Sequence, residues 1–266
     1  MFSQIAIFHA MDDTEEMPKL ESYTDVTIKR FPVLTTYMNS LCERTEAIRG
    51  KAVDRRVDNM LKVSTDGRKA ALDLRLVGKE QPTGESSKIC QCVERVTALY
   101  NKYPQMTQLI FCDYATPKSD AFNVYDALKE KLVQCGIPAA QIAFIHHYHT
   151  ESRKLELFRK FNAGDIRILI GSTFKLGIGA NVQERLKAIH HLDVPWRPAD
   201  MIQREGRILR RGNQNKNVII YRYITESSFD SYSWQILETK QRFITQFLTG
   251  TTYQRSIEDL ENQVLT

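Results

Sequence analysis

The chain has 266 residues, of which 42% are hydrophobic and 26% charged, and its net charge is +5. These values predict a soluble globular protein with one medium α/β domain plus appendages, or two small domains. No apolar run reaches the ~20 residues that cross a bilayer and no secretory signal is visible at the N-terminus, so we expect no membrane partner.

Five cysteines are scattered along the chain, at positions 42, 90, 92, 112 and 135. An odd, scattered set argues against a disulfide framework and is typical of a reducing compartment. The sequence therefore predicts a cytoplasmic protein.

Residues 1–106 show little regular patterning. Apolar spacing predicts helices over residues 31–48 and 57–76, and a polar, glycine-containing stretch predicts a loop over residues 79–87. Residues 108–225 are different, because short apolar runs alternate there with amphipathic stretches.

We expect strands at residues 108–112, 141–145, 166–170, 188–192 and 217–223, and helices at 121–134, 150–161 and 198–209. Strands that alternate with helices predict an α/β fold, a parallel sheet covered by helices on both faces. Such sheets bind ligands at the carboxyl ends of their strands. Beyond this core, apolar residues recur at helical spacing over residues 227–248, with Ser227 as the predicted cap.

Positive charge is concentrated in one block. Residues 151–223 hold 15 Lys and Arg against 7 Asp and Glu, whereas the rest of the chain holds 22 against 25. The block is either a solvated basic face or a surface for the phosphates of a nucleotide or nucleic acid. Charge alone does not decide between them, so the choice depends on the motifs that the block contains.

The most specific motif is Gln203–Gly212, QREGRILRRG, which fits the pattern Q-x-x-G-R-x-x-R. On a helix, Gln203, Arg207 and Arg210 share one face, because they lie four and three positions apart. Guanidinium groups are always charged and bind oxygens in a planar fork, so this face suits a polyphosphate. The alternative, a basic helix with surface ion pairs, leaves the mutual repulsion of four arginines unexplained.

Two further segments precede this motif. Gly171–Gln183, GSTFKLGIGANVQ, follows a predicted strand, and Gly177 and Gly179 permit close approach of the backbone to a ligand. It lacks the third glycine of a dinucleotide-binding fingerprint. Asp193–Ala199, DVPWRPA, predicts a rigid turn into the next helix, with Pro198 near the first helical residue. The simplest expectation for Trp196 is that it packs in the core.

Together, in this order and spacing, these segments resemble the C-terminal RecA-like lobe of Snf-type superfamily-two helicases and ATPases. Ser172–Asn181 is similar to motif V of that family and Gln203–Gly212 to motif VI, while Gln108–Asp113 resembles motif IV. The resemblance extends over most of residues 55–248. It is greatest to the large helicase proteins, often fused to a methylase, of bacterial phages, plasmids and conjugative elements.

The resemblance implies roles for particular residues. Arg207 and Arg210 are the expected catalytic arginines, with Gln203 positioning them. The segments around Gly177, Gly179, Asn181 and Gly206 would line the nucleotide site. The expected nucleic-acid contacts are Ser172, Thr173, Lys175 and Arg204. The implied cofactor is ATP with Mg²⁺, and the implied partners are DNA and an N-terminal RecA-like lobe of the same protein.

The sequence also departs from the family. Leu176 replaces the first of the paired glycines of motif V, and His146–His147 replace an Asp-Gly pair. His146, His147 and His149 lack a nearby carboxylate or cysteine that would complete a tetrahedral site, so we expect surface histidines and no metal.

The chain has no G-x-x-x-x-G-K-[ST] phosphate loop and no magnesium-binding acidic quartet. We therefore expect a C-terminal lobe of an ATP-dependent DNA helicase or translocase that is inactive alone, because the groups that hold Mg²⁺ and the outer phosphates belong to the other lobe. The predicted division is residues 1–106 as the end of lobe one and a helical connector, 107–225 as the RecA-like lobe, and 226–266 as a C-terminal helix and tail. The alternative is a non-catalytic DNA-binding or docking module.

Overall fold

The computed structural model describes residues 17–54, 56–80, 87–117, 121–177 and 180–249. Its centre is a sheet of six parallel strands in the order β1-β6-β5-β2-β4-β3. The fold is therefore the predicted α/β, RecA-like arrangement. The strands are β1 (Lys19–Ile28), β2 (Thr107–Phe111), β3 (Ile142–Phe144), β4 (Ile168–Gly171), β5 (Leu186–His191) and β6 (Asn217–Thr225).

Eight α-helices and three short 3₁₀ helices lie within the described residues. The α-helices are α1 (Pro32–Arg49), α2 (Met60–Leu72), α3 (Lys88–Lys102), α4 (Val124–Gln134), α5 (Glu151–Ala163), α6 (Thr173–Gly177), α7 (Pro198–Glu205) and α8 (Phe229–Thr249). The 3₁₀ helices are η2 (Leu74–Val77), η3 (Ala139–Gln141) and η4 (Ile145–His147). In the part of the chain that the structure describes, no helix combines the length and the apolar character needed to cross a bilayer.

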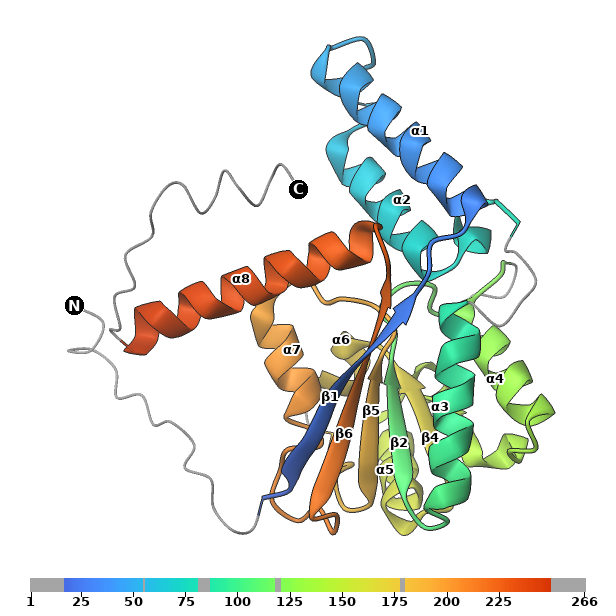
Figure 1. Ribbon diagram of the computed structural model, residues 1–266. Coiled ribbons are helices and arrows are strands. Elements are labelled where there is room, and N and C mark those ends of the chain that lie inside the picture. The colour runs from blue at the N-terminus through green and yellow to red at the C-terminus, as the bar shows by residue number, and fades with distance from the viewer. Residues whose placement is uncertain (1–16, 55, 81–86, 118–120, 178–179, 250–266) are drawn as a thin grey trace.

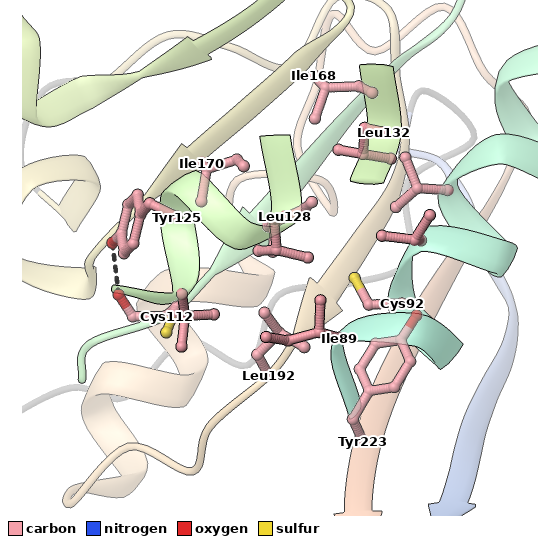
Figure 2. Close-up of a cluster of buried hydrophobic side chains, with 14 of the residues drawn as sticks. Ile89, Cys92, Cys112, Tyr125, Leu128, Leu132, Ile168, Ile170, Leu192 and Tyr223 are labelled. Carbon is pink, nitrogen blue, oxygen red and sulfur yellow. Dashed lines mark hydrogen bonds between the residues drawn. The ribbon is translucent and has the colours of Figure 1, made fainter. Parts of the chain in front are cut away.

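Successive residues of each central strand point to opposite faces of the sheet. In β4, Ile168 and Ile170 join the buried cluster beneath α3 and α4, whereas Leu169 joins the cluster beneath α5. Figure 2 shows the first cluster, in which Leu128 and Leu132 of α4 meet Ile168 and Ile170. Both faces of the sheet are therefore buried, which explains why these strands read as continuous apolar runs.

The edge strand β1 was not predicted from the sequence. It pairs in parallel with β6 over its whole length, so residues 19–28 belong to the sheet itself. Helix α3, which was also not predicted, contributes Ile89, Val93 and Val96 to the core. The predicted boundary at residue 106 therefore does not separate the connector from the lobe. Helices α1 and α2 project away from the sheet, beyond the carboxyl ends of the strands (Figure 1).

Helix α8 crosses the same end of the sheet (Figure 1). It begins near the predicted position, but Ser228 rather than Ser227 caps it, because the Ser228 hydroxyl accepts a hydrogen bond from the Asp230 amide at 3.2 Å. Its first residue, Phe229, lies directly against Gly67 of α2, where an added Cβ would be 2.2 Å from the aromatic ring. The two helices therefore approach each other through the absence of a side chain at Gly67.

A buried polar group lies within the sheet. His190 of β5 is fully buried, with Nδ1 2.9 Å from the Tyr223 hydroxyl and Nε2 3.0 Å from Oε1 of Gln108. Burial lowers the pKa of His190 to about 3. The imidazole is therefore neutral in the folded chain at neutral pH.

We expect this histidine to make the fold acid-sensitive. The unfolded chain takes up a proton at the ordinary histidine pKa of 6.5, whereas folded His190 resists protonation until about 3. Its contribution to stability is thus fully present above pH 6.5 and is lost progressively as the pH falls toward 3. Urea midpoints measured from pH 7 to 4 should fall less steeply in His190→Gln than in the wild type. Equal slopes would exclude this role.

Candidate functional site

The polar residues of the candidate site gather where the strands end. Asp113 follows β2, Ser172 and Thr173 follow β4, and Asp193 follows β5. Because all strands are parallel, these carboxyl ends lie at one edge of the sheet. The short helices α6 and α7 begin at the same edge and contact each other.

Asp113 fixes the start of α6. Its Oδ1 accepts a hydrogen bond from the Thr173 amide at 2.6 Å, and its Oδ2 accepts one from the Thr173 hydroxyl at 2.8 Å. A carboxylate at a helix N-terminus is stabilised by the amides that point toward it. The exit of β2 and the segment that follows β4 are therefore joined by one side chain.

Arg204 of α7 lies in the middle of this group and is only 1% exposed. Its Nε donates to Thr173 Oγ1 at 2.7 Å. Its Nη2 donates to Asp113 Oδ2 at 2.8 Å and to Asp193 Oδ1 at 2.9 Å, and its Nη1 donates to the Asp193 carbonyl at 2.9 Å. Burial raises the pKa of Asp193, and the Arg204 guanidinium opposes that rise. One buried guanidinium thus satisfies two acids and a hydroxyl.

These contacts correct part of the predicted nucleic-acid site. The sequence placed Thr173 and Arg204 at a phosphate-binding surface, but both are buried and hydrogen-bonded to each other and to Asp113. Ser172 is 8% exposed, and its hydroxyl lies 3.4 Å from His146 Nε2. Lys175 is half-buried. The predicted contact surface is therefore wrong for Thr173 and Arg204, whose polar groups serve the interior.

Several basic residues of the block at residues 151–223 are buried, so fewer of them face solvent than the sequence indicated. Arg167, Lys187 and Arg204 are interior residues, with exposures of 6%, 6% and 1%. Arg167 stacks on the Tyr100 ring and donates to the carbonyls of Tyr100 and Tyr103, at the amino ends of the strands. Part of the excess positive charge therefore caps backbone carbonyls instead of facing a ligand.

Gln203, Arg207 and Arg210 do not share one helical face. Helix α7 ends at Glu205, with Gly206 as its C-cap, and turns carry the chain through Arg207 and Arg210. Gln203 and Arg210 are exposed and Arg207 is half-buried. Burial lowers the pKa of Arg207, and the positive charge of Arg210 lowers it further. The two guanidiniums are thus close enough to interact, although a turn and not a helix brings them together.

The segment between β4 and β5 reaches this turn. Arg207 Nη1 donates to the Ala180 carbonyl at 2.9 Å, and the Asn162 side chain donates to the carbonyl of the exposed Asn181 at 2.9 Å. Gly177 ends α6, and Gly179 lies outside the described residues. The backbone segment that the sequence assigned to the nucleotide therefore adjoins Arg207.

Leu176, which stands where the family has a glycine, is fully buried. A Cβ at Gly171 would lie 2.3 Å from the Leu176 side chain and 2.8 Å from that of Ile145. The leucine therefore occupies the space that the last residue of β4 leaves empty. Its substitution for glycine is accommodated within the core.

The structure also places Trp196 and the histidines of residues 146–149. Trp196 is not in the core: it is 54% exposed, and the Arg68 guanidinium lies over its ring at 3.9 Å. His146 is half-buried against the edge of Tyr125, and its pKa is lowered to about 4 by burial and by Lys175 and His147. His147 and His149 are exposed. Among the described residues, no three His, Cys, Asp or Glu side chains are grouped to hold a metal.

Asp113, Asp193 and His191 were not identified as site residues from the sequence. His191 is fully buried beside Arg204, with its Nδ1 3.4 Å from Nη1 of that arginine. Their position in the sequence could have identified them, because each of the three ends or closely follows an apolar strand. Polar residues at such positions lie at the edge where α/β sheets bind ligands.

Parts of the chain are similar to known proteins. Residues 88–212 match the family model described as the helicase conserved C-terminal domain. The chain is 31% identical over 104 residues to the Defense against restriction protein B of Escherichia phage P1, a match that covers 39% of this chain and 5% of that protein. The C-terminal part of the Fun30 ATPase domain is 22% identical, with a TM-score of 0.47, over 59% of this chain and 48% of that one.

The matched residues 88–212 run from α3 through the turn that carries Arg207 and Arg210, and they include Asp113, Thr173 and Asp193. The site described above is thus contained within the matched region. Residues 88–212 are thus similar to the helicase conserved C-terminal domain, and this match supports a C-terminal lobe of a superfamily-two helicase.

Proposed function

We propose that this chain completes the ATP site of a DNA translocase or helicase of the Snf type by supplying two arginines to the γ-phosphate. The observation that carries the proposal is the pair Arg207 and Arg210, which the turn after α7 brings within electrostatic reach of each other, beside the segment that follows α6. Bringing two guanidiniums together costs free energy, and a polyanionic ligand between two lobes would offset that cost.

In this proposal Arg207 and Arg210 stabilise the charge that develops on the transferred phosphoryl group, and the exposed Gln203 orients the pair. The backbone around Gly177–Asn181 and Gly206 lines the cleft. The side chains of the turn fit the phosphates and not the metal, since Arg207 and Arg210 are cationic. Mg²⁺ and the inner phosphates would be held by the partner lobe, which closes over the site when ATP binds.

Fewer residues are left for the proposed DNA contact than the sequence indicated. With Thr173 and Arg204 committed to the interior, the half-buried Lys175 remains, together with Ser172, of which 8% is exposed. Contacts of this kind recognise the phosphate backbone and not the base sequence. We therefore propose a contact without sequence preference, in a cytoplasmic protein that acts on DNA.

The second candidate function is a non-catalytic DNA-binding or docking module. A binding module requires positive charge anywhere on a face. It does not require an amide and two arginines in one spacing, nor a backbone segment held against one of them at 2.9 Å. This geometry favours the ATPase proposal.

The isolated chain is expected to show no ATP hydrolysis with or without DNA, because its sequence has neither a phosphate loop nor a magnesium-binding acidic quartet. Steady-state phosphate release by the purified chain tests this expectation. Turnover that persists through repeated purification, and disappears in Arg207→Ala, would show that the chain holds a complete site.

A further inference from the structure

Arg204 is the largest fully buried side chain among the described residues, and it is a cation. Removing a guanidinium from water costs several kcal/mol, even when it is paired. An apolar residue at this position of α7 would avoid that cost. The buried charge therefore needs an explanation beyond the filling of space.

The contacts of Arg204 connect separate segments of the edge. Asp113 follows β2, Thr173 begins α6, and Asp193 follows β5, and the guanidinium donates to all three. Asp193 in turn accepts hydrogen bonds from the amides of Asp113 and Tyr114. The planar guanidinium thus holds three strand exits at fixed distances. A lysine, which has a single ammonium on a methylene chain, would not reproduce this.

Arg204 is also joined to Arg207 through the backbone. The Arg204 carbonyl accepts a hydrogen bond from the Arg207 amide at 3.2 Å. The Arg207 side chain reaches the Ala180 carbonyl, in the segment that begins with α6 at Thr173. Arg204 is thus bonded directly both to the start of α6 and to Arg207.

We propose that Arg204 is a positioning residue that makes α6 and the Arg207 turn move as one body. A displacement of α6 by DNA then changes the position of Arg207 at the nucleotide. In the same way, a displacement of Arg207 by the nucleotide changes the position of α6. Arg204 touches neither ligand. The inference rests on the function proposed above, in which Lys175 of α6 contacts DNA and Arg207 contacts ATP.

The test compares Arg204→Lys with Arg167→Lys in the protein that carries both lobes. Arg167 is a matched control, because it is also a buried arginine, 6% exposed and bonded to carbonyls. Unlike Arg204, it lies at the amino ends of the strands. We expect Arg204→Lys to lower the DNA-stimulated kcat on the order of 10²-fold, as small misplacements of catalytic groups do. Arg167→Lys should lose comparable thermal stability and keep its kcat.

Hydrogen exchange of the chain itself gives a readout independent of turnover. In Arg204→Lys, exchange should rise in residues 172–177 and 206–212 and stay unchanged in α4. Thr173→Val removes the hydroxyl that accepts from Arg204 while keeping the shape of the side chain, so it should give the same local pattern if the lysine variant does not fold.

Either of two results would overturn the proposal: uniform loosening of the whole chain in both Arg204→Lys and Thr173→Val, or a kcat that falls equally in Arg204→Lys and Arg167→Lys. Failure of the proposed function is distinguishable, because an active Arg207→Ala enzyme would refute it whatever the exchange pattern at residues 172–177.

Discussion

Replacing Arg207 or Arg210 by alanine in the protein that carries both lobes is expected to lower ATP turnover by ~10³–10⁵-fold, or about 4–7 kcal/mol. An arginine at the γ-phosphate acts mainly in the transition state, when charge shifts onto the transferred oxygens. Lysine at either position should restore little, since it keeps the charge and loses the planar fork. Steady-state ATPase with saturating DNA measures the effect.

Arg211→Ala is the matched control for these variants. Arg211 is exposed in the same turn and lies outside the Q-x-x-G-R-x-x-R pattern. Arg204, another arginine outside the pattern, is unsuitable as a control because it is buried and paired with two acids. Equal loss of activity in all three alanine variants, or full activity in Arg207→Ala and Arg210→Ala, would reduce the turn to a merely electrostatic surface.

The largest effect on stability is expected at Lys88, the first residue of α3. Its ammonium contacts the Asp230 carboxylate and donates to the Leu192 carbonyl at 3.1 Å, and both charged side chains are nearly inaccessible to water. Lys88→Met leaves Asp230 buried without its counter-charge, which costs about 3–5 kcal/mol in comparable pairs. Urea denaturation should show a large fall in the free energy of unfolding.

Two further variants separate the charge from the packing at this site. The double variant Lys88→Met with Asp230→Asn removes both charges and should recover much of the loss. Lys154→Met removes a lysine from a surface pair with the exposed Glu151 and should change stability little. If Lys88→Met alone is as stable as the wild type, Lys88 does not hold α3 to α8.

The strands β2 to β6 were predictable because each contains a short apolar run, and β2 to β5 are buried throughout. β1 was missed because the pattern is diluted at the edge of the sheet. Its residues alternate in burial, but Ser22 and Thr24 occupy inward positions where a central strand would place apolar side chains. Only Val26 and Ile28 are fully buried. The signal was therefore too short to distinguish from an irregular segment.

The arginine pattern at residues 203–210 predicted where chemistry would lie, but not which arginines face outward. Arg204 and Arg207 belong to one short run, and what buries the first is two acids, 91 and 11 positions away. The predicted helical face was wrong because α7 ends at Glu205. Local periodicity carries no information about either fact, since both depend on where the strand exits meet.

The pairing of β1 with β6 also has a consequence for biosynthesis. Lys19 finds its strand partner at Asn217, roughly 200 positions later in the chain, and pairs of such separation form slowly. At a synthesis rate of about 5–20 residues per second, β1 waits on the order of 10–40 s after leaving the ribosome before β6 exists. Its alternation of charged and hydroxyl residues, among them Glu21, Ser22, Thr24 and Asp25, is the composition that keeps an unpaired strand from aggregating during that interval.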